Sequence, residues 1–251
     1  MKKTGIYIPS VLTALNLGCG FFSIINAIKG NFSTSAWFIL GGWLLDILDG
    51  RLARITGTES NFGVEFDSFA DLITFGVAPA VLLWTSYLKN YPLGKFVCFI
   101  YVLAIAIRLA RFNVRALTGE RKKFFEGLPS PISGSLWAVF VLLMQGPKRA
   151  ISFVSKSIPS WAHLLPVFVL LISFLMLSKI RYTKFSNFRL TGLIPFRVFI
   201  IIIFSLIIVF IYPESAIFLI ILLYVLSGIL DVVIRFIKMR RKKGDIINVV
   251  K

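Results

Sequence analysis

Two short segments of this sequence carry four aspartates at spacings that suit a shared binding site. Asp46 and Asp49 are three residues apart, and Asp67 and Asp71 are four residues apart. On helices, each pair lies on one face. Four carboxylates that converge on one point repel one another unless a multivalent cation joins them. The pattern therefore predicts a site for Mg²⁺ or Mn²⁺, because ligand sets made only of oxygen suit these hard ions.

Two very small residues share the face of the first acidic pair. Gly50 and Ala53 follow Asp46 at the i+4 and i+7 positions of the same helix. Small residues let a neighbouring backbone or a flat ligand approach closely. The face therefore predicts a metal-binding shelf beside a slot for a planar group. Two cations bridged by these carboxylates would form the clamp that is used in phosphoryl-type displacements.

Two other interpretations of the acids remain open. The acids could pair with arginines, or they could form a proton or cation relay, as in a transporter. The arginines available for pairing are Arg51, Arg54, Arg108 and Arg111. Neither interpretation requires glycine and alanine between the acids, so the spacing favours a ligand site.

The composition predicts a polytopic membrane protein. Hydrophobic residues make up 57% of the chain, the mean hydropathy is +0.86, and apolar runs near the length of a bilayer crossing recur. We expect an all-α membrane helical bundle with about eight transmembrane helices, forming a single domain over residues 1–251. The expected spans are 9–28, 33–54, 66–88, 95–115, 132–146, 161–178, 196–212 and 214–238.

The positive charge gives an orientation and argues against one class of partner. The net charge of +17 is spread over short segments between apolar spans, with no separate basic domain, which argues against nucleic-acid binding. Most Lys and Arg residues fall on one side if every span crosses, so that side is predicted to be cytoplasmic. This orientation predicts an integral protein of the cell membrane, with Asp49, Arg54 and Gly63 at the cytoplasmic face.

The acidic segments resemble a known family signature. They read Asp46-x2-Asp49-Gly50-x2-Ala53-Arg54-x8-Gly63-x3-Asp67-x3-Asp71, which is similar at every position to the signature of the CDP-alcohol phosphotransferases. The segment from Pro9 to Gly20, with Thr13 and Asn16, extends the resemblance upstream. The segments 108–113 and 125–131 resemble the membrane-bound phosphatidylserine synthase branch of that family. The likeness covers about residues 5–240.

The resemblance implies a fold, a reaction and a set of roles. It implies a six-helix catalytic core over about residues 9–178, two additional helices over about 196–238, and a homodimer. The implied reaction is transfer of the phosphatidyl group from CDP-diacylglycerol to L-serine, which gives phosphatidylserine and CMP. Asp46, Asp49 and Asp67 are then metal ligands, and Asp71 is a ligand or the general base. The residues implied for the CDP-lipid slot are Thr13, Asn16, Gly50, Ala53, Arg54 and Gly63.

The acceptor end of the site is predicted from charge. The carboxylate of serine suits an arginine fork, and its ammonium suits an acid or hydroxyl. We therefore expect Arg108 or Arg111 to receive the carboxylate, with Glu126 or Ser130 near the ammonium. Glycerol phosphate or inositol phosphate is the alternative acceptor for the same chemistry. A cation transporter is the alternative from a different class of protein.

Overall fold

In the computed structural model, most of the described residues lie in helices. The described residues are 7–56, 60–117, 124–145, 164–178, 180–183, 214–228 and 230. The helices within them are α1 (Tyr7–Ile28), α2 (Phe32–Thr56), α3 (Asn61–Asp71), α4 (Ala78–Leu83), α5 (Gly94–Leu117), α6 (Ser130–Gln145) and α8 (Leu165–Leu177). A further helix, here called the C-terminal helix, covers Glu214–Gly228.

Three helical stretches of the described chain are long and apolar enough to cross a membrane. They are Val11–Ile28, Asn61–Leu88 and Gly94–Arg115. The helices α6, α8 and the C-terminal helix are apolar but shorter. Large apolar side chains such as Phe21, Phe99 and Phe174 remain exposed on the outer helix faces. Such faces suit a hydrocarbon environment, where no water penalises them.

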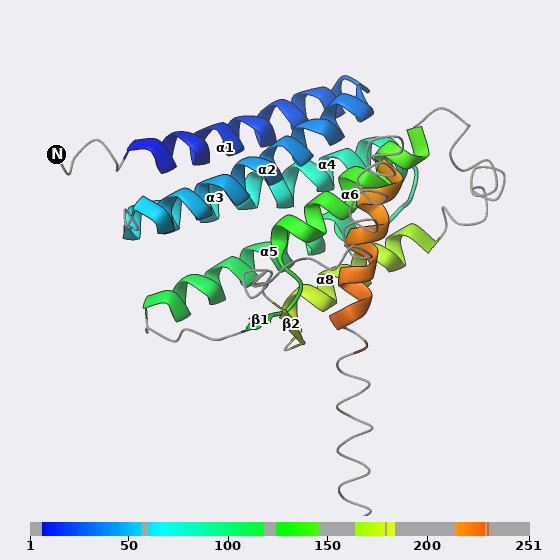
Figure 1. The fold of residues 1–251 in the computed structure, drawn as a ribbon. Coiled ribbons are helices and arrows are strands. Elements are labelled where there is room, and N and C mark those ends of the chain that lie inside the picture. Colours follow the sequence, from blue (N-terminus) through cyan, green and yellow to red (C-terminus); the bar gives the residue numbers. More distant parts are fainter. Residues whose placement is uncertain are drawn as a thin grey trace, which may run out of the picture.

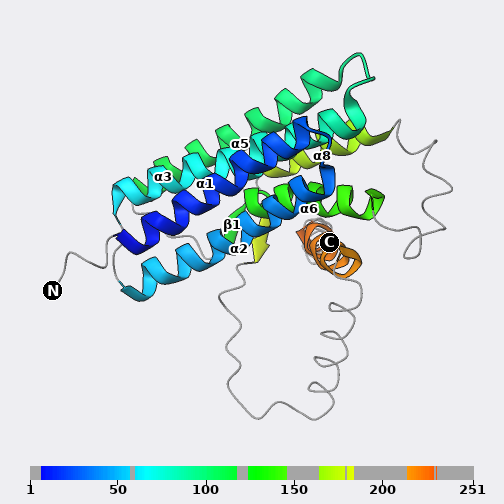
Figure 2. The ribbon, with the colours of Figure 1, turned by 90° about the horizontal axis from the view of Figure 1, so that it is seen from above.

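The helices that carry the acids, α2 and α3, both pack against α1. α1, α2 and α3 run side by side in both ribbon views (Figure 1 and Figure 2). α2 also contacts α6, and α5 contacts α8. Gly30 has a φ of +83° in the turn between α1 and α2, a conformation that glycine adopts without steric cost. This turn reverses the chain and brings α2 back along α1.

The stretch Asn61–Leu88 is one continuous helix with two π-helical segments. α3 begins at the N-cap Ser60, whose hydroxyl accepts a hydrogen bond from the Gly63 amide at 3.0 Å. The first π-helical segment, η2 (Leu72–Val77), begins directly after Asp71, and the second, η3 (Trp84–Leu88), follows α4. Single π-helical turns within α-helices are frequent at functional sites.

Neighbouring helices hold η2 through specific contacts. Thr74 Oγ1 donates to the backbone carbonyl of Asn16 at 2.8 Å, which joins η2 to α1. Tyr101 Oη donates to the carbonyl of Phe75 at 2.9 Å, which joins η2 to α5. Gly134 of α6 lies so close to Phe75 that a Cβ would meet the Phe75 backbone at 2.8 Å. Because η2 is held from three sides, the preceding Asp71 has a fixed position.

The described chain also contains a two-stranded antiparallel ribbon. β1 (Phe124–Glu126) pairs with β2 (Arg181–Thr183), and Phe125 lies opposite Tyr182. The ribbon joins the segment before α6 to the segment after α8 (Figure 1). Both strands are three residues long. The hydropathy pattern predicts neither strand, but the regular elements of the described chain are otherwise all helices, in agreement with the all-α expectation.

The helical architecture agrees with the sequence analysis in its main features. Helices occupy the predicted spans 9–28, 33–54, 66–88 and 95–115, and α6 covers residues 132–145 of the predicted span 132–146. α8 covers most of the predicted span 161–178, and the C-terminal helix covers the first part of 214–238. The predicted span 196–212 lies outside the described residues.

Candidate active site

Three of the four aspartates gather at one point between α2 and α3. Asp46 comes from α2, and Asp67 and Asp71 come from successive turns of α3. One carboxylate oxygen of each lies within 4.8 Å of the others. Asp71 is buried, with 7% of its surface exposed, and Asp46 and Asp67 are partly buried. The reversal between α2 and α3 therefore brings the two acidic faces together.

The fourth aspartate has a different environment. Asp49 is also buried, and it accepts a hydrogen bond from the Thr13 hydroxyl of α1. It does not belong to the group of three whose oxygens lie within 4.8 Å. The hydroxyl of Thr13 therefore stabilises the negative charge of the Asp49 carboxylate. Asp49 lies about one helical turn beyond Asp46 on α2.

The donor set of the three gathered carboxylates fits a hard divalent cation. All the ligand atoms are oxygens, as Mg²⁺ and Mn²⁺ prefer. Among the described side chains, none of the three forms a salt bridge with an arginine. Three mutually close acids without such a partner repel one another, and a cation would remove this repulsion. The ion-pair interpretation of the cluster is therefore weaker than the metal interpretation.

Arg108 and Ser130 lie beside the buried end of the acidic cluster. Arg108 Nη1 donates to Ser130 Oγ at 2.9 Å, and Ser130 at the start of α6 is fully buried. Asp71 interacts electrostatically with Arg108 and through its side chain with Ser130. Arg108 Nε and Asp71 Oδ1 are both buried and have no hydrogen-bond partner in the described structure. An acidic and a basic group with free bonding capacity thus lie side by side, which suits a zwitterionic ligand.

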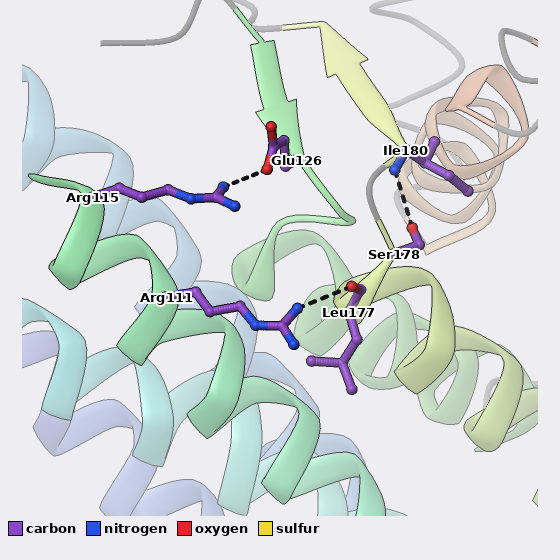
Figure 3. Close-up of polar contacts among 6 residues, drawn as sticks. All are labelled: Arg111, Arg115, Glu126, Leu177, Ser178 and Ile180. Carbon is purple, nitrogen blue, oxygen red and sulfur yellow. Dashed lines mark hydrogen bonds and ion pairs between the residues drawn. The ribbon is translucent and has the colours of Figure 1, made fainter. Parts of the chain in front are cut away.

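The other two residues predicted for the acceptor lie farther out. Arg111 is exposed and donates to the carbonyl of Leu177, at the end of α8, at 3.2 Å. Glu126 of β1 forms an ion pair with Arg115 at 2.5 Å. Figure 3 shows both contacts bracing β1 and the end of α8. The structure therefore brings Arg108 and Ser130 to the acidic cluster, while Arg111 contacts the end of α8 and Glu126 joins β1 to Arg115 of α5.

The residues predicted for the CDP-lipid slot line the same helices. Thr13 and Asn16 are buried on α1, Gly50 and Ala53 are partly buried on α2, and Gly63 lies in the first turn of α3. Arg54 lies on α2, and its side chain falls outside the described residues.

The amide of Asn16 points to an additional polar ligand. Its exposed fraction is 1%, and neither Oδ1 nor Nδ2 has a hydrogen-bond partner in the described structure. Buried amides normally have partners, so an orphaned one indicates a ligand or ordered water. A Cβ on Gly42 would come within 2.8 Å of Asn16 Oδ1 and 2.5 Å of the Thr74 methyl group. Gly42 therefore leaves room for the Asn16 and Thr74 side chains to lie against α2.

The sequence analysis did not identify the residues that hold η2, the segment that follows Asp71. Gly42, Thr74, Tyr101 and Gly134 hold η2 and its surroundings in place. The Gly41-Gly42 pair within an apolar helix was the available signal, because small residues in membrane helices mark close approaches. Thr74 and Tyr101 carry no comparable signal.

Comparison with known proteins gives a consistent assignment. The family profile for CDP-alcohol phosphatidyltransferase matches residues 6–172. A CDP-diacylglycerol–serine O-phosphatidyltransferase of Helicobacter pylori is 37% identical over 178 residues, which cover 70% of this chain and 72% of that protein. The Bacillus subtilis enzyme of the same name is 34% identical over 182 residues, covering 71% of this chain and 91% of its own length. An archaetidylserine synthase of Methanothermobacter thermautotrophicus is 33% identical over 181 residues, covering 71% and 70%.

Proposed function

The chain belongs to the CDP-alcohol phosphatidyltransferase family, and we propose that it is a CDP-diacylglycerol–serine O-phosphatidyltransferase. It transfers the phosphatidyl group from CDP-diacylglycerol to the hydroxyl of L-serine and releases CMP. The observation that carries the proposal is the position of the Arg108–Ser130 pair directly beside the acidic cluster. Serine is named as part of the activity in the bacterial relatives and in the archaeal one.

Asp46, Asp67 and Asp71 are the proposed metal ligands. Their oxygens are close enough to bind one ion together, and Asp49 beside them is assigned to the same centre, for which we propose two ions, Mg²⁺ or Mn²⁺. Bound there, the cations would neutralise the diphosphate oxygens and make CMP a better leaving group. Thr13 holds the Asp49 carboxylate in place.

The remaining slot residues are assigned to the nucleotide end of the CDP-lipid. Gly50, Ala53 and Gly63 carry little or no side chain, so a flat group can approach the backbone there. Asn16 offers an unpaired amide donor and acceptor, and Arg54 is assigned to the diphosphate.

The acceptor is assigned to the Arg108 side of the cluster. The guanidinium of Arg108 binds the serine carboxylate, and Ser130 fixes the guanidinium through its hydroxyl. Asp71, with a free carboxylate oxygen, accepts the proton of the serine hydroxyl. The new bond forms between the serine oxygen and the lipid phosphorus. The phosphoanhydride bond breaks, and CMP leaves with its electron pair, so no covalent enzyme intermediate is required.

The proposal extends to topology and assembly. The chain crosses the cell membrane eight times, with a six-helix core over about residues 9–178 and two more helices over about 196–238. The distribution of Lys and Arg supports a cytoplasmic active site. A homodimer is proposed from the family resemblance.

The test uses purified protein with CDP-diacylglycerol, Mg²⁺ or Mn²⁺, and labelled L-serine. We expect serine-dependent transfer of label into lipid with matching CMP release, loss of both with EDTA, and recovery on adding excess Mg²⁺ or Mn²⁺. Asp67→Asn should lose at least about 100-fold in turnover, because a ligand of the centre is gone. Glu65→Gln is the matched control, since Glu65 is an exposed acid on the same helix that accepts from Asn113 at 3.1 Å.

Each other outcome has a defined meaning. CMP release with glycerol phosphate or inositol phosphate, but not with serine, would keep the chemistry and change the acceptor. No CMP with any alcohol would reject the transferase proposal in favour of a transporter. Equal losses in Asp67→Asn and Glu65→Gln would reject the assignment of Asp67 to the metal centre.

A further inference from the structure

The C-terminal helix lies beyond the segment that matches the family. The family match ends at residue 172, whereas this helix covers Glu214–Gly228. One of its faces belongs to the same hydrophobic core as Leu128, which comes two residues before Ser130. The buried residues on that face include Ile221, Tyr224 and Val225. An element outside the matched region therefore packs against the part of the molecule that leads into α6.

Tyr182 of β2 joins the ribbon to this helix. Its exposed fraction is 1%, and its ring stacks on the ring of Tyr224 with the centroids 5.4 Å apart and 30° between the planes. A Cβ on Gly228, about one turn farther along the helix, would lie 2.2 Å from the Tyr182 ring. The lack of a side chain at Gly228 therefore lets the ring lie against the helix backbone. Figure 3 shows the C-terminal helix, in pale orange, behind Ile180 next to β2.

The ribbon leads directly into the start of α6. The Gly127 amide, immediately after β1, donates to the carbonyl of Ile180, immediately before β2, at 2.8 Å. Three residues after Gly127, Ser130 begins α6, and its hydroxyl accepts from Arg108 Nη1 at 2.9 Å. A displacement of the ribbon is therefore transmitted through a short segment to the hydroxyl that orients Arg108.

The ribbon is too small to hold this position by itself. Each strand has three residues, and an isolated two-stranded ribbon is at best marginally stable, so it requires packing against other elements. Successive side chains of a strand point to opposite faces, and Tyr182 is the middle residue of β2. Its ring supplies the packing on the face that meets the C-terminal helix. The ion pair between Glu126 and Arg115 of α5 holds the other strand.

We propose that Tyr182 is a positioning residue for the acceptor site. Its ring, seated on Tyr224 and Gly228, fixes the ribbon. The ribbon in turn holds Ser130 where its hydroxyl orients Arg108. This inference rests on the proposed function, which assigns the acceptor carboxylate to Arg108. An arginine side chain has many rotamers, and ordering it only on binding weakens the complex. The C-terminal helix is then a functional part of the acceptor site.

The test compares variants with the wild-type enzyme by steady-state kinetics in both substrates, with Tm measured in detergent. Tyr182→Ala removes the ring, so we expect the KM for serine to rise about fivefold to tenfold, with kcat and the KM for CDP-diacylglycerol within about twofold of wild type. Gly228→Ala displaces the ring and should show the same selective rise. A purely structural role for the ring would not raise one KM and leave the other unchanged.

Three further variants are controls. Tyr182→Phe keeps the ring and removes a buried hydroxyl that has no hydrogen-bond partner in the described structure, so the serine KM should stay within about twofold of wild type and the Tm should not fall. Leu223→Ala, on the exposed face of the C-terminal helix, should match wild type in all three constants. The double variant Tyr182→Ala/Gly228→Ala should keep the serine KM of Tyr182→Ala within about twofold, because the added methyl group acts through the ring.

Three results would overturn the inference. The first is an unchanged serine KM in Tyr182→Ala. The second is a rise in both KM values together with a lower kcat, which indicates a general loss of structure. The third is a double variant in which the two single effects on the serine KM multiply, because the two positions then act independently. If Tyr182→Ala is not recovered folded, Gly228→Ala decides by the first two criteria. If the wild-type enzyme uses another alcohol, the proposed function fails, and the inference is judged by the KM of that alcohol.

Discussion

Replacing Gly127 with alanine is expected to disturb the proposed acceptor site by displacing the segment that precedes Ser130. Gly127 joins β1 to the start of α6, and its φ is +77°. A Cβ there would lie 2.1 Å from the carbonyl oxygen of Met176. The Gly127 amide donates to Ile180 O at 2.8 Å, and the Leu128 amide donates to Leu175 O at 3.2 Å. The new methyl group can fit only if the segment moves away and weakens these two bonds.

The size of the effect follows from these contacts. A left-handed backbone costs an L-residue about 1–2 kcal/mol. Each lost backbone hydrogen bond adds about 0.5–1.5 kcal/mol. We therefore expect Gly127→Ala to lower the free energy of unfolding by about 2–5 kcal/mol, or the Tm by roughly 5–15 °C for a chain of this size. Ser130 lies three residues on, so serine turnover should fall on the order of 100-fold if its hydroxyl shifts by about 1 Å.

Two other glycines serve as controls. Gly30 has a φ of +83° but no atom within 4 Å of the position of a Cβ. Gly30→Ala should therefore show only the backbone cost, about 1–2 kcal/mol. Gly18 in α1 has neither a positive φ nor a close neighbour, so Gly18→Ala should be neutral or slightly stabilising. Tm in detergent and serine-dependent CMP release are measured for all three. The reasoning would be refuted if Gly127→Ala had the same Tm as Gly30→Ala and kept wild-type serine kinetics.

Two further changes test contacts around the acids. Thr13→Val removes the hydroxyl that donates to Asp49. Because a hydrogen bond to a charged group is lost, the KM for CDP-diacylglycerol should rise about tenfold, while the KM for serine stays unchanged. An unchanged KM for CDP-diacylglycerol would contradict the assignment of Thr13 and Asp49 to the CDP-lipid end of the site. Tyr101→Phe leaves the Phe75 carbonyl without its donor and removes a 3.2 Å contact with Ser133. It should lower stability by about 1–3 kcal/mol in thermal unfolding, and an unaltered Tm would show that another group satisfies this carbonyl.

The sequence predicts the gathering of the acids because the relevant rules are local. Asp67 and Asp71 lie one turn apart on a single helix, and a short reversal after α2 brings Asp46 close to them. Which neighbour each carboxylate meets is not a local property. Asp49 meets Thr13 because of how α1 is rotated against α2, and packing of whole helices sets this rotation.

Hydropathy predicts where the apolar spans lie, but it misses polar helix ends and very short strands. The third span is predicted at 66–88, whereas the helix begins at Asn61 after the N-cap Ser60. Its first turn contains polar residues that lower the hydropathy, and the cap was the signal to use. The strands β1 and β2 are too short for an alternating pattern. Their pairing depends on the contact between α5 and α8, which is a long-range property.

The arginines of α5 show that residues on the same face of a helix can have different roles, because they lie at different positions along its axis. Arg108 and Arg111 are three residues apart, so the pattern predicts a similar direction for both. Three residues also advance the chain by about 4.5 Å along the axis. This advance moves Arg111 from the level of Ser130 to the end of α8, where its guanidinium meets the Leu177 carbonyl. Arg115, one turn farther, meets Glu126 of β1. Along α5, Arg108 thus lies at the acidic cluster, Arg111 contacts the end of α8 and Arg115 braces β1. An Arg111 variant should therefore act on serine binding only through the position of the α8 end.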